Sequence, residues 1–399
     1  MGSLMDRTFL ELLRSLPRLN AKNASMRKCK VCGRDASLFD VVDFNKFCGH
    51  ECYAFGTSGV PVYYFRCPSC EFLFTDFCDE WGPEDYSHLI YNDDYAKVDP
   101  DYLGARPIRE ASSMRSVLKG CESSRLLDYG SGSGIFAEEM TRIGFSKVSN
   151  YDPFSSPTRP SGVFDIITCF EVIEHSPDPI ATLHDMMDML SDRGAIFVGQ
   201  TLQPFNIEEV RGAWWYLAPR NGHISTYSDV TFSTIAHAAN LHYYRGNFNY
   251  VFARTGLADP VRRAAERIGP RVDTIVLFAP KEGDFGTAWH KPEKSLSMTF
   301  RWSALDELRW EKVSLAPSMV RIRIPYVMEI AKDFAKNCKV FLNDGQLSTF
   351  VASGNIVAET IIRESDSFDI TLRTPPPVAP KSIRISSDER LLGLAVEVA

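Results

Sequence analysis

The chain has 399 residues, of which 44% are hydrophobic, and it carries a formal net charge of −7 at pH 7. A chain of this length and composition can bury a large core and is expected to form two or three domains. The acidic balance and the lack of a sustained basic run argue against nucleic acid as the main partner. The sequence also has no apolar run of the roughly 18 to 20 residues that a membrane span needs, and no signal-peptide pattern, so a cytoplasmic location is expected.

Cysteine is concentrated near the N-terminus, where seven of the ten cysteines lie between residues 29 and 78. Two C-x-x-C pairs lie in this stretch, and their cysteines are Cys29, Cys32, Cys67 and Cys70. Each pair can place two thiolates on one tight turn, and two such pairs make a tetrahedral zinc site with no open position. We therefore predict a structural zinc here. Cys48 and Cys52 are alternative ligands, and a redox pair or incidental core cysteines are the competing interpretations.

A short apolar run ends at Asp128 and is followed by three alternating glycines and the start of a helical pattern. Glycine lets the backbone turn sharply and approach a ligand closely, and the N–H groups of the helix start point at that ligand. The dinucleotide fingerprint G-x-G-x-x-G would require glycine where Ile135 stands. A carboxylate before the first glycine instead suits a cationic or hydrogen-bond-donating ligand. The residues predicted to line this nucleoside-cofactor site are Asp128, Gly130, Ser131, Gly132 and Gly134.

Strand-like and helix-like patterns alternate after the glycines. A helix is predicted over residues 136–144, followed by strands over residues 147–151 and 164–170. Asp152 ends the first of these strands about twenty residues after the glycines, where an acid can hold both ribose hydroxyls, with a simple turn as the alternative. A further helix, ending near Gly194, and a buried strand over residues 195–200 follow. This alternation predicts a doubly wound, mostly parallel sheet with its ligand at the carboxyl ends of the strands.

Residues from about 85 to 280 resemble a class I S-adenosylmethionine (SAM) methyltransferase, with a Rossmann-like α/β sheet. The resemblance rests on Asp-x-Gly-x-Gly-x-Gly from Asp128, on Asp152, and on Phe-Asp-(x)5-Glu-Val-Ile-Glu-His ending at His175. It implies SAM as methyl donor, with Asp128 and the glycines around the methionine part and Asp152 at the ribose. Only eleven residues separate Asp152 from Phe164, where family members fit a helix, a strand and an adenine-binding acid. No adenine-binding acid is therefore assigned.

Three more residues are expected to bind the cofactor in this resemblance. Tyr95 and Arg106, which precede the first strand, would cap its pocket, with Arg106 near the methionine carboxylate. A polar connection between domains is the alternative for this segment. Glu171, at the end of the strand over residues 164–170, is placed beside the sulfonium.

Glu171, Glu174 and His175 have i, i+3, i+4 spacing, which puts all three on one face if the segment turns helically. The Glu-x-x-Glu-His pattern resembles the metal-binding motif of small-RNA 2′-O-methyltransferases and of ubiquinone-pathway O-methyltransferases. His223, after the next strand, would complete two carboxylates and two imidazoles, a set that suits Mg, Mn or Fe. In bacterial sugar C-methyltransferases the stretch corresponding to that around His223 carries a catalytic histidine. Three interpretations stay open: a metal site, a metal-free general base at His223 or His175 beside Glu174, and a structural hydrogen-bonding role.

The acceptor is predicted to be a sugar. A cysteine-rich zinc module ahead of a SAM domain resembles the arrangement in bacterial sugar methyltransferases. The run Trp214-Trp215-Tyr216 can stack on sugar faces or form a hydrophobic lid. From about residue 285, short strand-like runs separated by turns predict a β-sandwich. Its end, residues 386–396, resembles the closing segment of accessory domains of bacterial polysaccharide-modifying enzymes, and a dimerisation or docking module is the alternative.

The sequence thus predicts three parts. Residues 1–84 would hold an N-terminal segment and the zinc module, residues 85–284 the methyltransferase domain, and residues 285–399 the β-sandwich, which could serve a homo-oligomer or a biosynthetic complex. The predicted function is methyl transfer from SAM to a sugar hydroxyl of a glycan or nucleotide sugar, in surface polysaccharide biosynthesis. The alternatives are a small-molecule O- or C-methyltransferase of secondary metabolism and a catalytically silent SAM-binding scaffold.

Overall fold

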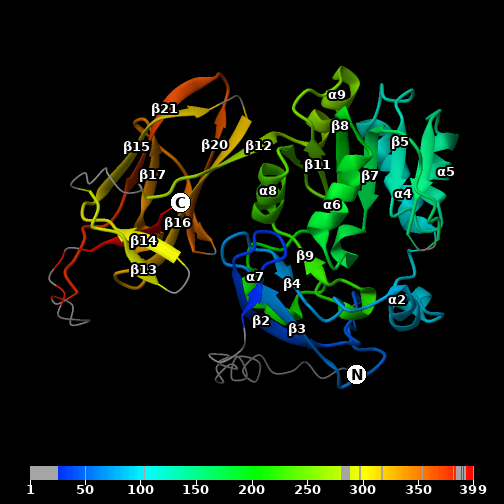
Figure 1. The fold of residues 1–399 in the computed structure, drawn as a ribbon, viewed down its shortest axis with the longest axis horizontal. Coiled ribbons are helices and arrows are strands. Elements are labelled where there is room, and N and C mark those ends of the chain that lie inside the picture. The colour runs from blue at the N-terminus through cyan, green and yellow to red at the C-terminus, as the bar shows by residue number, and fades with distance from the viewer. Residues whose placement is uncertain are drawn as a thin grey trace, which may run out of the picture.

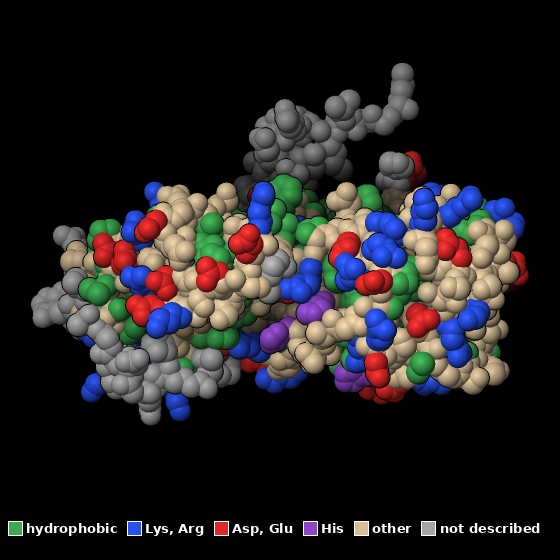
Figure 2. Space-filling model, turned by 90° about the horizontal axis from the view of Figure 1, so that it is seen from above, with side chains coloured by type: hydrophobic (Ala, Val, Ile, Leu, Met, Phe, Trp, Pro, Cys, Tyr) green, Lys and Arg blue, Asp and Glu red, His purple; other side chains and the backbone are tan. Residues whose placement is uncertain are grey.

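The computed structural model describes residues 26–399 except residues 50, 103, 154, 280–287, 296–297, 316–317, 353, 381, 383–387, 389, 391 and 399. Most of the predicted N-terminal segment therefore lies outside the described residues. The chain forms two lobes side by side, with the C-terminal strands in one and the rest of the chain in the other (Figure 1). Acidic and basic side chains are interspersed over both lobes when the molecule is seen from above (Figure 2). No described helix is long and apolar enough to cross a membrane.

The cysteine-rich segment forms a small antiparallel sheet. Its strands are β1 (Arg27–Lys28), β2 (Asp35–Asp43), β3 (Pro61–Arg66), β4 (Leu73–Phe74) and β9 (Ser225–Thr226), in that order. β9 comes from a distant part of the chain, and it pairs with β4 through Thr226 and Ser225. The N-terminal module is therefore hydrogen-bonded to the segment that immediately follows His223.

The next part of the chain is an α/β sheet with helices on both faces. Its elements are α2 (Pro83–Leu89), α3 (Tyr95–Val98), α4 (Ala105–Val117), β5 (Leu126–Tyr129), α5 (Ile135–Arg142), β6 (Val148–Tyr151), β7 (Phe164–Phe170), η1 (Ile173–His175), α6 (Pro179–Asp188), β8 (Leu190–Gly199), α7 (Ile207–Val210), η2 (Arg211–Ala213), η3 (Pro219–Asn221), α8 (Asp229–Ala238), β10 (His242–Arg245), β11 (Asn249–Ala253) and α9 (Asp259–Ile268). β6, β5, β7 and β8 are parallel neighbours in that order. β11 then pairs antiparallel with β8, and β10 with β11.

The two faces of this sheet bury different helices. Successive strand residues point to opposite faces. Ile166 accordingly packs with residues of α4, α5 and α9, whereas the adjacent Ile167 packs with residues of α6 and α8. The predicted α/β sheet with helices on both faces is therefore confirmed, and its first four strands are parallel, whereas β11 and β10 are joined to it by antiparallel pairs. Residues 153–163 contain no helix or named strand among those described, in agreement with the short spacing seen in the sequence.

The start of β8 differs from the prediction. The sequence placed a helix end near Gly194 and a strand over residues 195–200, but α6 already ends at Asp188 and β8 begins at Leu190. The pairing of β7 with β8 shifts register between Phe164 and Ile166. A Cβ on Gly194 would lie 2.8 Å from the carbonyl oxygen of Asp165, so glycine serves here as a bulge residue inside a strand.

The C-terminal strands form two sheets. The first holds β13 (Glu293–Ser295), β14 (Met298–Trp302), β22 (Leu394–Glu397), β16 (Ser318–Glu329), β20 (Asn355–Ile362) and β19 (Thr349–Ala352). The second holds β15 (Glu307–Leu315), β21 (Asp366–Arg373), β17 (Lys339–Leu342) and β18 (Gly345–Gln346). Buried residues of both sheets belong to one hydrophobic cluster, which includes Ile322 of β16 and Leu372 of β21.

One strand joins the two lobes. β12 (Arg271–Val276) pairs antiparallel with β10 and parallel with β16. The first C-terminal sheet therefore continues the α/β sheet, and together they contain 13 strands among the described residues. The predicted boundary at residue 284 falls among residues outside the description, after this shared strand.

Candidate functional site

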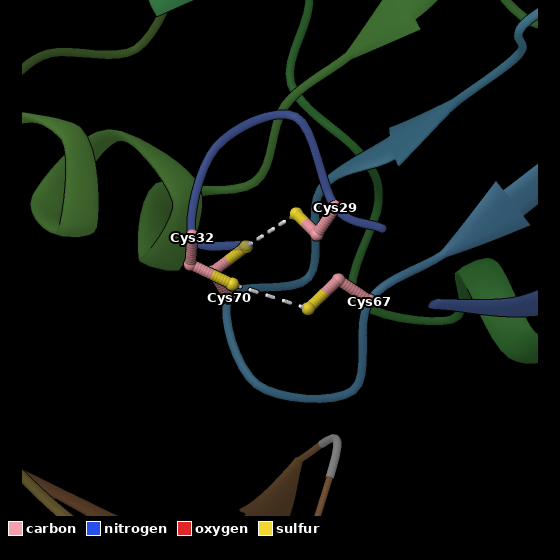
Figure 3. A group of neighbouring side chains, drawn as sticks. All are labelled: Cys29, Cys32, Cys67 and Cys70. Carbon is pink, nitrogen blue, oxygen red and sulfur yellow. Dashed lines mark hydrogen bonds between the residues drawn. The ribbon is translucent and has the colours of Figure 1, made fainter. Parts of the chain in front are cut away.

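The four predicted zinc ligands come together. The sulfur atoms of Cys29, Cys32, Cys67 and Cys70 all lie within 4.8 Å of one another (Figure 3). Both turns begin with a backbone hydrogen bond to a cysteine carbonyl, from Gly33 to Cys29 at 2.9 Å and from Glu71 to Cys67 at 2.9 Å. Cys48 and Cys52, the alternative ligands, lie outside this group. The arrangement is that of two facing turns, each contributing two thiols.

The glycine loop lies between β5 and α5. The N–H groups of Gly130 and Ser131 donate to the carbonyl of Tyr151 at 2.8 and 3.1 Å. Gly130 has a φ of 74°, and a Cβ there would lie 2.4 Å from the side chain of Val172. Only glycine therefore lets the loop pack against the segment that follows β7, so the loop and that segment adjoin.

Two carboxyl groups flank the loop, as the sequence predicted. Asp128 is 4% exposed, and its carboxyl accepts a hydrogen bond from the Thr168 hydroxyl at 3.1 Å. Burial is the main cause that raises the pKa of Asp128 to about 7. The Asp152 carboxylate accepts the N–H groups of Gly132 at 3.1 Å and of Ser155 at 2.8 Å. Both acids thus stand at the carboxyl ends of adjacent parallel strands, where a cofactor would lie.

The segment before α4 lies over the loop. Tyr102 comes within 3.8 Å of the Cβ position of Gly132, and its ring packs edge-on against Tyr95 with centroids 5.2 Å apart. Tyr95 is buried, and its hydroxyl donates to the carbonyl of Asn221 at 3.4 Å. Arg106 forms two hydrogen bonds with the carboxylate of Asp99, at 2.7 and 2.9 Å. The cofactor contacts expected of Tyr95 and Arg106 stay predictions.

Glu174, His175 and His223 form a cluster whose potential ligand atoms lie within 4.8 Å of one another. Nδ1 of His175 lies 3.1 Å from the carbonyl of Gly222, and Nδ1 of His223 lies 2.9 Å from the carbonyl of Tyr216. A carbonyl can only accept, so both Nδ1 atoms donate and both Nε2 atoms keep a lone pair. Burial lowers the pKa of His175 to about 4, and burial also lowers the pKa of His223 well below its usual range. Both imidazoles are therefore neutral at pH 7.

Tyr216 connects the two glutamates. Its hydroxyl lies 2.6 Å from Oε1 of Glu174 and 3.3 Å from Oε2 of Glu171. Oε2 of Glu174 is buried and has no hydrogen-bond partner among the described residues. Burial raises the pKa of Glu174 well above its usual range. The sequence grouped four residues as metal ligands, whereas the structure brings three together and Glu171 is not one of the close set.

Two residues of this site differ from their predicted roles. Sugar stacking or a hydrophobic lid is predicted for the aromatic run that contains Tyr216, but Tyr216 is only 2% exposed. Cys48 is an alternative zinc ligand in the prediction, but its sulfur lies 3.6 Å from Nδ1 of His223. The N-terminal module holds His223 from a second side, because the Tyr64 hydroxyl donates to the His223 carbonyl at 2.7 Å.

A cavity of about 210 Å³ lies beside this cluster. It opens where β7 and β8 end, and its wall includes Glu110 of α4, Glu171, Gln200 and Phe248. Glu171 therefore belongs both to the wall of this cavity and to the hydrogen-bonded group around Tyr216.

Residues 105–245 match the family model of a methyltransferase domain. The ubiquinone biosynthesis O-methyltransferase of Shewanella pealeana is 26% identical over 127 residues, which cover 25% of this chain and 53% of that protein. The ubiquinone biosynthesis O-methyltransferase of Xanthomonas euvesicatoria pv. vesicatoria is 30% identical over 118 residues, which cover 23% and 48%. This chain thus spans about half the length of these curated relatives.

Among solved structures, the mitomycin 7-O-methyltransferase MmcR aligns with a TM-score of 0.34 and 12% identity, covering 43% of this chain and 60% of that chain. The match to the family model spans α4 to β10, which includes the glycine loop, both flanking acids and the Glu174 cluster. The chain therefore contains a SAM-dependent methyltransferase domain.

Proposed function

We propose that this protein transfers the methyl group of SAM to a hydroxyl of a sugar, in a glycan or a nucleotide sugar of surface polysaccharide synthesis. The observation that carries the proposal is the cluster of Glu174, His175 and His223, in which Glu174 and His223 are buried and His175 is half-buried. It follows β7, and Val172 in the same segment packs against Gly130 of the glycine loop. The cluster therefore stands next to the place where SAM is expected.

The methyl donor needs no activation by this cluster, whereas a hydroxyl acceptor does. The sulfonium of SAM is already activated, so in-line placement of the nucleophile supplies most of the acceleration. A sugar hydroxyl is a poor nucleophile until it loses its proton. His175 is neutral and half-buried, and its Nε2 is free to take that proton while Nδ1 stays bonded to Gly222. The oxygen then forms its bond to the methyl carbon as the carbon–sulfur bond breaks, which leaves S-adenosylhomocysteine.

The same residues fit a divalent cation. Glu174, His175 and His223 offer one carboxylate oxygen and two imidazole nitrogens, a donor set that suits Mg, Mn or Fe. The unpartnered Oε2 of Glu174 is a buried oxygen that such an ion would satisfy. A bound ion would lower the pKa of an acceptor hydroxyl, so that a weaker base could remove its proton. Glu171, which the sequence grouped with these ligands, would then act from outside the ion's immediate ligands.

The remaining parts fit the same proposal. Four thiols within 4.8 Å of one another match a structural zinc, and a reducing cytoplasm would keep them able to bind it. The two C-terminal sheets that share one cluster support a β-sandwich accessory domain over residues 285–399. A small-molecule hydroxyl acceptor is the second candidate, favoured by curated relatives that are named for ubiquinone biosynthesis.

The test is methyl transfer from labelled SAM to a panel of nucleotide sugars, glycan extracts and small phenols, with and without a divalent-metal chelator. Zinc content is measured in each sample, so that loss of the structural zinc is not mistaken for loss of a catalytic ion. We expect His175→Ala and His223→Ala to lower kcat about 100-fold or more, and His184→Ala, on the exposed side of α6, to change it little. Labelled phenols without labelled sugars would favour the second candidate, and SAM binding with no labelled product would favour a silent scaffold.

A further inference from the structure

The cavity beside Glu171 shares that residue with the expected cofactor site. It lies between α4 and the ends of β7 and β8, next to the start of β11. Neither the glycine loop nor Asp128 or Asp152 contributes to its wall. A molecule in this cavity would therefore approach the reacting centre past Glu171, without displacing the glycine loop, Asp128 or Asp152.

Two carboxyl groups line the cavity. Glu110, on α4, forms no hydrogen bond or ion pair with another described residue, and burial raises its pKa to about 8. Glu171 has a φ of 52°, a left-handed conformation that non-glycine residues rarely adopt. Such strain is usually kept where the surrounding structure needs one orientation of a side chain. The strained backbone thus holds the Glu171 side chain at the cavity wall.

The nearest basic side chains are already engaged. Arg106 bonds the carboxylate of Asp99 through both guanidinium nitrogens. Arg109, at the cavity wall, lies 3.6 Å from the carboxylate of Asp101, and its side chain is 64% exposed. The two carboxyl groups of the cavity therefore face a space with more acceptors than cations.

Gln200 is a second and independent sign of a missing ligand. It is only 3% exposed and lines the cavity at the end of β8. Both polar atoms of its side chain are buried and have no hydrogen-bond partner among the described residues. Buried amides are almost always hydrogen-bonded, so this one is expected to meet a polar group that enters the cavity.

We propose that this cavity binds an ammonium group of the acceptor, so that the substrate is a hydroxyl compound with a primary amine, such as an amino sugar. This inference rests on the proposed methyl transfer. An ammonium has three N–H donors, which match the carboxyl oxygens of Glu110 and Glu171 and the amide oxygen of Gln200, and a bound cation would favour the ionised form of Glu110. The amide nitrogen of Gln200 remains free to donate to a hydroxyl. Phe248, which is 73% exposed at the cavity wall, offers an apolar surface to the carbon skeleton.

The test is calorimetric titration of the full chain, saturated with S-adenosylhomocysteine, with three probes at pH 7: D-glucosamine, N-acetyl-D-glucosamine and D-glucose. We expect glucosamine to bind at least about ten-fold more tightly than the other two. Glu110→Gln removes one carboxylate and should abolish this preference. Glu138→Gln is the matched control, because Glu138 is exposed on α5 and lies away from the cavity, and it should keep the preference.

Equal affinity of the wild type for the three sugars would overturn the inference. An unchanged preference in Glu110→Gln would overturn it as well. If Glu110→Gln weakens SAM binding to the same extent, the carboxylates serve the ammonium of the cofactor and the acceptor inference is wrong. Since these titrations need no turnover, a failure to label any acceptor would count against the proposed methyl transfer alone.

Discussion

Asp128 shows how a single buried carboxyl group prepares the cofactor site. The fold keeps it almost entirely out of water, and burial raises its pKa from the usual 3.8 to about 7. Between these two pH values the folded chain holds a proton that the unfolded chain has lost. The free energy of unfolding is therefore highest below the pKa of Asp128 in the unfolded chain, 3.8. It falls as the pH rises from there to the pKa of Asp128 in the folded chain, about 7.

Because of Asp128, we expect the free energy of unfolding to be about 3 kcal/mol lower at pH 8 than at pH 5. Asp128→Asn removes the titrating group with little change of shape. The drop in unfolding free energy from pH 5 to pH 8 should therefore be smaller in this variant by that amount. Urea unfolding of both proteins without SAM at the two pH values measures the difference. Asp188→Asn, at the exposed end of α6, is the control. The prediction fails if wild type and Asp128→Asn lose the same free energy over this range.

At the residue scale, the local part of the site was predictable and the part made by distant segments was not. Asp128 and the glycines are close in the chain, and one strand, loop and helix place them. Tyr216 lies 42 residues from Glu174, and only the folded chain brings its hydroxyl to that carboxylate. Tyr216 also stands in an aromatic run with Trp214 and Trp215. Such a run predicts contact with a ligand at the surface and gives no sign that the Tyr216 hydroxyl is buried and hydrogen-bonded.

At the scale of elements, a strand could be predicted when it was long enough to show a local pattern, and could not when it depends on pairing with a distant strand. β5 and β7 were predictable because apolar runs mark them locally, and β6 because it lies between Gly144, which follows a helix, and Asp152. β9 has two residues and exists because it pairs with β4, some 150 residues earlier. No local period marks such a strand. Its consequence is functional, since β9 and the Tyr64 hydroxyl of β3 tie the cysteine module to the backbone around His223.

We therefore expect the predicted zinc to stabilise the catalytic segment as well as its own module. Cys70→Ser should lose the bound zinc, lower the midpoint of thermal unfolding by about 5–10 °C, and reduce methyl transfer. Cys52→Ser changes a thiol of the same module outside the cluster and should leave all three unchanged. Elemental analysis, thermal unfolding and transfer assays check this. A Cys70→Ser protein with wild-type zinc content would sink the assignment.

At the scale of the whole molecule, a group of charges around one buried arginine links the two lobes. Arg321 of β16 is 4% exposed and forms ion pairs with Asp229 of α8 and Glu359 of β20. Arg245 of β10 reaches the same two carboxylates, at 3.4 and 3.6 Å. The side chains come from both lobes, so the contact has to be formed by the complete chain. Sequence alone did not reveal it, because the four residues are scattered over more than 100 positions.

Arg321→Ala should lower the free energy of unfolding by about 3–5 kcal/mol, because it leaves two partly buried carboxylates with one shared cation. Arg309→Ala is the matched control: Arg309 bonds Asp369 on the surface, where an ion pair contributes little. Denaturant unfolding of the three proteins measures the effect. Equal loss of unfolding free energy in both variants would show that the charges around Arg321 do not join the lobes.

The strand β12 has a consequence for how this chain can change over evolutionary time. β10 covers one of its edges, and β16 covers the other through five paired residues, Val272 to Val276 with Met319 to Arg323. Deleting the C-terminal strands would leave the N–H and C=O groups of that edge open to strands of other molecules, a known route to aggregation. Loss of the C-terminal lobe during evolution would therefore require that β12 first be shortened or that its exposed edge be covered by another segment.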